Sequence, residues 1–530
     1  MSKLKSVKHI FWVSLFMVSI LCLAFAVSFS GETEVNPLKT EACTSILVGK
    51  LASVDGSTMT SHSCDSNTDR TWINVIPHKQ YKAGEMSKLY FEPKRTKGPN
   101  DSDRLERGEI PQVKETFAFI NTAYPVMNEY QLAIGETTFD GKSELKSDEG
   151  VIDCPELYRL VLERAKTARE AIRVADDLTK KYGYVDWGEC FTFADPQETW
   201  LFEILGPGKG KKGAVWAAVR IPDDHVGVSA NASRIRQINL SDQDNYMASD
   251  NVHSLAEELG WWDPESGEPF EFCYAYASRR SMGSRRREWR VLSQVAPALN
   301  LDPNGENFPF SVKAEKKLSV KDVLDIFRDA YQDTPYDMTS PLTTVNRKGE
   351  TVKSPVASPF LNRDLMSLLK IQRERTICSP RATYLQVTQS RSWLPDAIGG
   401  VVWLGYDNPA STPHIPFYCG ITQMPESYRI DGRWGFRRDC AWWAFRRVSQ
   451  LAKFRWQVME KDIEKVWMGI EEKAYKDQES IEEEALRLYK QNPKKAREFL
   501  TKYCLEMAKN AVKSYWKLGD DLWGRYTNLF

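Results

Sequence analysis

The stretch from Cys43 to Asp65 holds residue types that support covalent catalysis by a thiol. Cys43 is followed by the apolar run 46–48 and then by Asp55-Gly56, a pair that is a strong signal for a hairpin turn. A second, polar-rich stretch would return beside the first and bring His62 and Asp65 toward Cys43. We therefore expect a hairpin with Cys43 at the outer end of its first strand.

A cysteine nucleophile needs a base, and the sequence offers an unusual one, the amino group of Cys43 itself. That group becomes available when the residues before Cys43 are removed. A free thiol has a pKa of about 8.5 and an α-amine one of about 7.7–8.0, so the two can exchange a proton near neutral pH. The thiolate would attack a carbonyl carbon, and the amine would pass the proton to the leaving group. The alternative is that Cys43 is one buried cysteine among ten, without a catalytic role.

The first residues are typical of a secretory signal. Three lysines precede or flank the start of an apolar stretch over 10–27, and Ala24-Phe25-Ala26 fits a small-x-small cleavage site. We expect a signal peptide over 1–26, a propeptide over 27–42, and export to the periplasm or the extracellular space. The membrane would then be a partner only through the signal segment. A single membrane anchor is the alternative, because the apolar stretch approaches transmembrane length.

Composition restricts the class of protein. The chain has 530 residues, 42% of them hydrophobic and 27% charged, and its formal net charge is zero. A chain of this length can bury a large core, in one large domain or two. Balanced charge gives no electrostatic reason to expect nucleic acid as a partner. The cysteines form no C-x-x-C motif, so we expect no metal and no cofactor, while disulfide pairing stays open.

The elements that would hold the hairpin change type along the chain. Strand-like segments, among them a hairpin over 188–204, lie on either side of two predicted helices. These helices begin at Pro155 and at the capping pair Thr167/Glu170. The order strands, helices, strands predicts sheets faced by helices.

Two polar tracts and a helical end complete the outline. Residues 93–113 are rich in Lys, Arg, Asp and Pro, and 333–363 in Pro, Thr and Ser, so we expect an exposed loop and a long surface excursion. From about Cys440 the chain turns helical. One helix would begin at the capping pair Ser480/Glu483 and another at Asn492-Pro493.

Four pieces of the chain, in a fixed order, carry a resemblance to a known family. They are 42–50 with 55–58, Asn128-Glu129-Tyr130 with 132–136, the hairpin over 188–204, and 229–235. Together they resemble the secreted cysteine dipeptidases of the dipeptidase A type. These belong to the N-terminal-nucleophile (Ntn) hydrolase superfamily, with penicillin V acylase and bile salt hydrolase. The resemblance implies an α+β fold of the four-layer αββα Ntn type, autocatalytic exposure of Cys43, and hydrolysis of dipeptides or short peptides.

The resemblance also implies roles for individual side chains. Asp65 would hold and orient the α-ammonium of Cys43, and a turn aspartate is the alternative. Asn231, at a strand end, is the expected oxyanion donor, with a turn asparagine or a glycosylation sequon as the alternative. Losing one such donor typically lowers a rate about 10²–10³-fold. Arg285, in an arginine-rich run, is expected to reach the site and to hold Asp65 or a substrate carboxylate.

One position departs from the pattern of the acylase relatives. They carry an Arg three residues before the Asp that holds the amine, and this chain has His62 there. His62 could hydrogen-bond the thiolate or the substrate, and both a structural role and a conventional Cys–His pair stay open. Asn128 or Thr137 could supply a second oxyanion donor.

The sequence thus predicts an exported thiol dipeptidase, with a catalytic domain over 43–430 and a helical C-terminal region over 431–530 packed on it. Its partner would be a dipeptide or short peptide, and assembly into a homo-oligomer stays open. Two alternatives remain: an Ntn amidase or acylase acting on non-peptide amides, and a non-enzymatic envelope binding protein with an unprocessed N-terminus. A dipeptidase needs charged groups for the substrate termini, whereas an acylase needs an apolar pocket.

Overall fold

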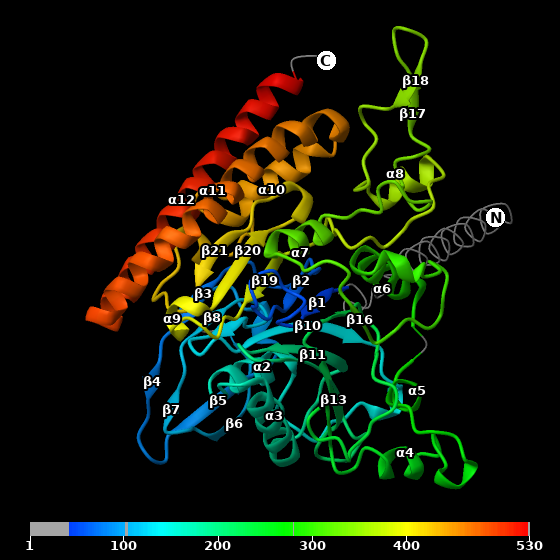
Figure 1. The fold of residues 1–530 in the computed structure, drawn as a ribbon, viewed down its shortest axis with the longest axis vertical. Helices are drawn as coiled ribbons and strands as arrows, with labels where there is room; N and C mark the ends of the chain where they lie inside the picture. The colour runs from blue at the N-terminus through cyan, green and yellow to red at the C-terminus, as the bar shows by residue number, and fades with distance from the viewer. Residues whose placement is uncertain (1–41, 101–103, 279, 528–530) are drawn as a thin grey trace, which may run out of the picture. The chain divides into compact units, whose positions relative to one another are not determined.

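The computed structural model describes residues 42–100, 104–278 and 280–527 (Figure 1). The chain from Ala42 onward forms one compact unit. The predicted signal peptide over 1–26 lies outside the described residues, as does the predicted propeptide over 27–42 except for Ala42. None of the helices in the described ranges has an apolar stretch long enough to cross a bilayer.

An eight-stranded antiparallel sheet forms the largest layer of the molecule. Its strand order is β15-β13-β12-β11-β10-β9-β8-β3. The predicted hairpin over 188–204 is confirmed as β11 and β12 at the centre of this sheet. The strands are β3 (Asn74–Ile76), β8 (Phe119–Asn121), β9 (Met127–Asn128), β10 (Ala133–Phe139), β11 (Gly188–Ala194), β12 (Thr199–Leu205), β13 (Val215–Ile221) and β15 (Tyr246–Ala248).

Two further sheets share the N-terminal hairpin between them. A four-stranded sheet has the order β2-β19-β20-β21, and a three-stranded sheet has the order β1-β14-β16. Their strands are β1 (Ser45–Val48), β2 (Ser61–Cys64), β14 (His225–Ser229), β16 (Ser311–Lys313), β19 (Tyr384–Gln389), β20 (Val401–Tyr406) and β21 (Ile415–Tyr418). Three two-stranded pairs complete the strands: β4 (Lys79–Gln80) with β7 (Glu115–Thr116), β5 (Met86–Tyr90) with β6 (Glu106–Pro111), and β17 (Thr343–Val345) with β18 (Thr351–Lys353).

The N-terminal hairpin packs directly on the face of the large sheet. A Cβ atom at Gly135 in β10 would lie 2.1 Å from the backbone oxygen of Ser61 in β2, so only glycine fits there. Across the same interface, the Thr60 hydroxyl lies 2.7 Å from that of Thr192, and the Gln386 amide donates to the backbone oxygen of Ile134 at 3.1 Å. Because buried polar groups need hydrogen-bond partners, these contacts fix the position of the hairpin relative to the large sheet.

Helices lie on the outer faces of these layers (Figure 1). Helix α3 packs on β11 and β12, α7 packs on β19, and α10 to α12 pack on β20 and β21. Helix α6 packs on β14 and β16 of the three-stranded sheet. The α-helices are α2 (Cys154–Leu162), α3 (Ala168–Tyr182), α4 (Ser254–Glu258), α5 (Phe272–Tyr276), α6 (Met282–Val295), α7 (Val320–Phe327), α8 (Arg363–Leu368), α9 (Asp396–Gly399), α10 (Ala441–Ala452), α11 (Trp456–Gln491) and α12 (Pro493–Thr527).

Most of the predicted helix starts are confirmed. Helix α2 begins beside Pro155, and the Thr167 hydroxyl accepts a hydrogen bond from the backbone N–H of Glu170 at the start of α3. Helix α12 begins at Pro493, as Asn492-Pro493 predicts. The residues from Cys440 on are helical, and they cover one face of the four-stranded sheet.

Two predictions about local structure are wrong. Ser480 does not begin a helix: it lies inside α11, where its hydroxyl donates back to the backbone oxygen of Asp477. A serine can satisfy itself this way within a helix, and packing against α12 keeps the long helix continuous. The tract 93–113 is not all loop, because β6 lies in it and pairs with β5.

Candidate active site

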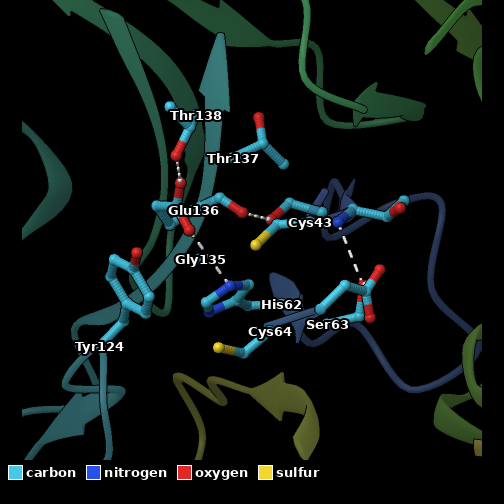
Figure 2. Close-up of polar contacts among 12 residues, drawn as sticks. Cys43, His62, Ser63, Cys64, Tyr124, Gly135, Glu136, Thr137 and Thr138 are labelled. Atoms are coloured by element: carbon cyan, nitrogen blue, oxygen red, sulfur yellow. Dashed lines mark hydrogen bonds and ion pairs between the residues drawn. The ribbon is translucent and has the colours of Figure 1, made fainter. Parts of the chain in front are cut away.

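The predicted hairpin is present and brings Cys43, His62 and Asp65 together. Thr44 pairs with Ser63, which places Cys43 opposite Cys64 on the neighbouring strand. The backbone N–H of Thr44 donates to the Ser63 hydroxyl at 3.1 Å, and the Ser63 N–H donates to the Thr44 backbone oxygen at 3.0 Å (Figure 2). Cys43 is buried, so its thiol lies inside the protein rather than on the surface.

The Cys43 thiol lies beside a buried ion pair that the sequence did not reveal. Its sulfur, a ring nitrogen of His62 and a carboxylate oxygen of Glu136 all lie within 4.8 Å of one another. The Nε2 atom of His62 is 3.2 Å from Oε2 of Glu136 (Figure 2). Tyr124 and Tyr384 pack edge-on against the imidazole, at ring-centre distances of 5.2 and 5.6 Å. The ring is thus fixed against both the thiol and the carboxylate.

Glu136 is held as firmly as His62. It lies on β10 and is fully buried, and the Thr138 hydroxyl lies 3.0 Å from Oε1 of Glu136 and 3.0 Å from Oε1 of Glu189. Burial and the Glu136 charge raise the pKa of Glu189 well above its ordinary value. Glu189 is therefore a neutral acid beside an ionised Glu136. The signal that could have found Glu136 is a carboxylate within a strand whose neighbours are otherwise apolar or small.

The charges in this cluster follow from burial and from the contacts between the groups. A hydrogen bond with the Cys64 thiol, burial and the Glu136 carboxylate raise the pKa of the Cys43 thiol well above its ordinary value. Burial lowers the pKa of His62, but the neighbouring Cys43 and Glu136 outweigh it and raise this pKa to about 10. Burial likewise opposes the ionised Glu136, but His62 lowers its pKa to about 2. The pair is therefore imidazolium and carboxylate near neutral pH.

The stability of the fold should depend on pH through this pair. The pKa of His62 rises from 6.5 to about 10 on folding, so its contribution is fully present below pH 6.5 and is lost as the pH rises toward 10. The pKa of Glu136 falls from 4.5 to about 2, so its contribution is present above pH 4.5 and is lost as the pH falls toward 2. We expect His62→Gln to lower the urea midpoint most between pH 4.5 and 6.5 and least near pH 10. A difference from the wild type that does not change with pH would contradict a charged pair.

The same cluster contains donor types that metals accept. Thiolate, imidazole and carboxylate are all ligands of zinc in proteins. In this structure Nε2 of His62 and Oε2 of Glu136 contact each other directly, and this ion pair satisfies both charges without a metal.

Asp65 lies at the peptide bond that precedes Cys43. Its Oδ2 atom accepts hydrogen bonds from Arg375 and from the Ser63 hydroxyl, and the same Arg375 nitrogen donates to the backbone oxygen of Ala42. Its Oδ1 atom is buried and has no hydrogen-bond partner among the residues that the structure describes. Burial raises the pKa of Asp65, and Arg375 opposes this. A cation placed at Oδ1 would therefore be strongly favoured.

The arginine that reaches Cys43 is Arg287 and not Arg285. Arg285 donates to the backbone oxygens of Asn304 and Gly305, at 3.2 and 2.9 Å, away from the thiol. The two arginines are two positions apart on α6, a rotation of about 200° around a helix with 3.6 residues per turn. They therefore point to opposite sides, and the prediction for Arg285 is wrong for this geometric reason.

Arg287 joins Cys43 to Asn231, the predicted oxyanion donor. Its Nη1 donates to the backbone oxygen of Cys43 at 2.5 Å and to the Thr44 hydroxyl at 2.9 Å. Its Nη2 donates to Ala230 O at 3.0 Å and to Oδ1 of Asn231 at 2.9 Å. The planar guanidinium of Arg287 therefore holds Cys43 and Asn231 in a fixed position relative to each other.

Asn231 follows the end of β14, as predicted. Its φ of 59° lies in the left-handed region, which asparagine tolerates better than most residues. One hydrogen of its amide donates to the Thr138 backbone oxygen at 2.7 Å, which leaves the second hydrogen for a ligand.

Asn128, a candidate for a second oxyanion donor, lies elsewhere. Its amide donates to Leu162 O and Ala165 O, so it supports the fold. The Thr137 hydroxyl points away from Cys43 in Figure 2 and lies 2.5 Å from that of Ser229.

Arg287→Ala and Arg285→Ala form a matched pair on one helix. We expect Arg287→Ala to lower kcat/KM about 10²-fold, because displacement of a catalytic group by about 1 Å can cost that much. Arg285→Ala should change it little. Steady-state kinetics of both variants checks this, and an equal loss in both would show that α6 acts only as a packing element.

The cysteines of the described ranges are mostly buried. None of the nine from Cys43 to Cys504 in the described ranges forms a disulfide with another of them, and all but Cys273 are buried. The disulfides that the sequence left open are therefore not formed among them.

The geometry agrees with what comparison of the sequence shows. A profile of peptidase family C69 matches residues 42–469, which starts one residue before Cys43 and ends within α11. The chain belongs to peptidase family C69. This confirms the predicted family, and the hairpin that carries Cys43 lies at the start of the matched region.

Several bacterial relatives of this C69 protein carry dipeptidase names. A probable dipeptidase of Salmonella dublin is 30% identical over 421 residues, 75% of this chain and 84% of that protein. A probable dipeptidase of Latilactobacillus sakei is 28% identical over 407 residues, 74% of this chain and 77% of that protein. Dipeptidase A of Lactobacillus helveticus is 24% identical over 434 residues, 79% of this chain and 84% of that protein.

Proposed function

We propose that this protein is a cysteine dipeptidase whose nucleophile is Cys43, acting as the N-terminal residue after the chain up to Ala42 has been removed. The observation that carries the proposal is the position of Asp65. One guanidinium nitrogen joins its carboxylate to the Ala42 carbonyl, and its buried Oδ1 has no partner in the described part of the chain. An ammonium at the nitrogen of Cys43 would supply the missing positive charge.

We propose further that the fold is the four-layer αββα sandwich of the Ntn hydrolases. Two sheets packed face to face, with helices on the outer face of each, support this assignment. Cys43 lies just before a strand of the inner layers, where a freed amine would be enclosed by the hairpin.

The α-amine of Cys43 is the base in this mechanism, and His62 is not. With a pKa of about 10, His62 already holds its proton at neutral pH and cannot accept another. An α-amine, with an ordinary pKa of about 7.7–8.0, can. The thiol proton moves to the amine, the sulfur attacks the substrate carbonyl, and the amine then protonates the departing amino group. Water cleaves the resulting thioester, with the same amine as base.

The other residues of the site have distinct tasks. Asp65 orients the ammonium, and the free hydrogen of the Asn231 amide stabilises the oxyanion. The imidazolium of His62, held by Glu136, stabilises the thiolate by its positive charge. This charge opposes the effect of burial, which raises the pKa of the Cys43 thiol. Arg287 keeps Cys43 and Asn231 in position.

A dipeptide substrate is favoured over a non-peptide amide. Arg381 lies close enough to Asp65 to act on its charge and offers a cation for the carboxylate of a peptide, and the relatives carry dipeptidase names. The test is a comparison of purified protein on a dipeptide panel, on penicillin V and on conjugated bile salts. We expect turnover of dipeptides alone. Turnover of the acyl amides alone would replace the proposal with an Ntn acylase, and no turnover at all would favour a binding protein.

Export belongs to the proposal as well. The lysines and apolar stretch of the first residues support it. Fractionation of the native host should find the processed chain outside the cytoplasm, and a processed, active chain confined to the cytoplasm would contradict export.

A further inference from the structure

Arg375 lies at the one peptide bond whose cleavage the proposed function requires. It belongs to the segment between α8 and β19 and is half-buried. Its Nη2 donates to the carbonyl oxygen of Ala42 and to Oδ2 of Asp65, while Nη1 donates to the backbone oxygen of Thr376. The Ala42 carbonyl is half of the Ala42–Cys43 bond, so this guanidinium contacts the bond itself.

The two arginines of the site contact different carbonyls. Arg287 donates to the carbonyl oxygen of Cys43, one residue beyond the bond in question. Arg375 donates to the carbonyl oxygen of Ala42. Negative charge would develop on the Ala42 oxygen during cleavage, and a fixed cation there stabilises it. Arg287 is on the wrong carbonyl for this task.

We propose that Arg375 catalyses removal of the propeptide by holding the carbonyl oxygen of Ala42 while the Cys43 thiol attacks that carbonyl. This inference rests on the proposed function, in which Cys43 becomes the N-terminus. The Cys43 sulfur bonds to the carbonyl carbon of Ala42, and the oxyanion forms against Arg375. The carbon–nitrogen bond then breaks, and the proton from the thiol ends on the departing nitrogen. Water hydrolyses the thioester, which leaves a carboxylate on Ala42 and restores the thiol.

The buried Oδ1 atom of Asp65 supports the same cleavage step. Arg375 and Ser63 occupy only Oδ2, so Oδ1 is buried without a partner from the described ranges while the peptide bond is intact. An unpaired buried carboxylate oxygen is costly, and a new ammonium beside it removes that cost. Cleavage creates such an ammonium at Cys43. Arg375 therefore holds the carbonyl that reacts and also turns Asp65 toward the amine that is released.

The test follows self-cleavage of the full-length chain made by cell-free synthesis, with the chain length read by mass spectrometry over time. We expect Arg375→Gln to cleave at least about 100-fold more slowly than the wild type, the usual cost of losing one oxyanion donor. Arg375→Lys, which keeps the charge, should recover part of the rate. Arg373→Gln, an exposed arginine two residues away, is the matched control and should cleave normally.

A second form of the variant separates this inference from the proposed function. In it, residues up to position 42 are replaced by the recognition sequence of a site-specific protease, so that added protease exposes Cys43 without help from Arg375. A urea midpoint of released Arg375→Gln equal to that of the released wild type would show that the variant folds and that its defect is in cleavage. Wild-type-rate self-cleavage of Arg375→Gln would overturn the role of Arg375 alone. A wild-type chain that keeps Ala42 and still hydrolyses dipeptides would overturn the proposed function together with it.

Discussion

Cys43→Ala is expected to abolish dipeptide hydrolysis, by at least about 10⁵-fold, and to leave the propeptide in place. Both losses follow because one thiol is proposed to attack the substrate and the Ala42–Cys43 bond. Cys43→Ser should have weak or no activity, because an alcohol is far harder to deprotonate than a thiol, even beside the His62 cation.

The measurement is the rate of dipeptide hydrolysis together with the mass of the purified chain. Cys504→Ala, which removes a buried thiol from α12, serves as the control for loss of a cysteine in the core. It should be processed and active. Full-rate hydrolysis by purified Cys43→Ala would remove this site from consideration.

Asp65→Asn is expected to lower kcat by about 10²–10⁴-fold, the range for a positioned acid–base group. The amide has the same shape and can still accept from Ser63 and Arg375, so the fold should survive. What is lost is the negative charge that orients the ammonium of Cys43. KM should change less than kcat, because the defect lies in proton transfer.

The kcat values of wild type and Asp65→Asn are compared in the protease-released form of the chain, because every variant then starts from the same N-terminus. Asp69→Asn, four residues along the same segment, is a matched control, because Asp69 is buried against the Cys64 thiol and does not contact Ala42 or Arg375. An unchanged kcat in correctly processed Asp65→Asn would mean that another residue holds the amine.

The parts of the site that could be predicted are those encoded within one short segment. Cys43, His62 and Asp65 are joined by a turn whose Asp-Gly signal is local, and Ser57 bonds back to the Asp55 carboxylate as such turns do. The strand-end position of Asn231 was also predictable, because the strand before it and the turn are adjacent in sequence. Helices with strong first-turn signals, such as α2 and α12, were found for the same reason.

The parts of the site and fold that could not be predicted depend on contacts between distant parts of the chain. Glu136 and Arg375 reach the site from β10 and from the segment before β19, and nothing in their local sequence points to Cys43. The arginine-rich run on α6 shows the limit most clearly, since the sequence places Arg285 and Arg287 equally well and only the packing of α6 on β14 selects one face. Ser480 has a capping pattern, but the packing of α11 on α12 overrides it.

The central claim is that the active enzyme begins at Cys43. Its most direct test is the mass of the N-terminal peptide of purified, active protein, after alkylation of its reactive thiol. The mechanism predicts that this peptide starts at Cys43 with a free α-amine and carries the label on Cys43. Fully active protein whose N-terminal peptide still contains Ala42 would contradict it, because the proposed base would then be an amide nitrogen that cannot accept a proton.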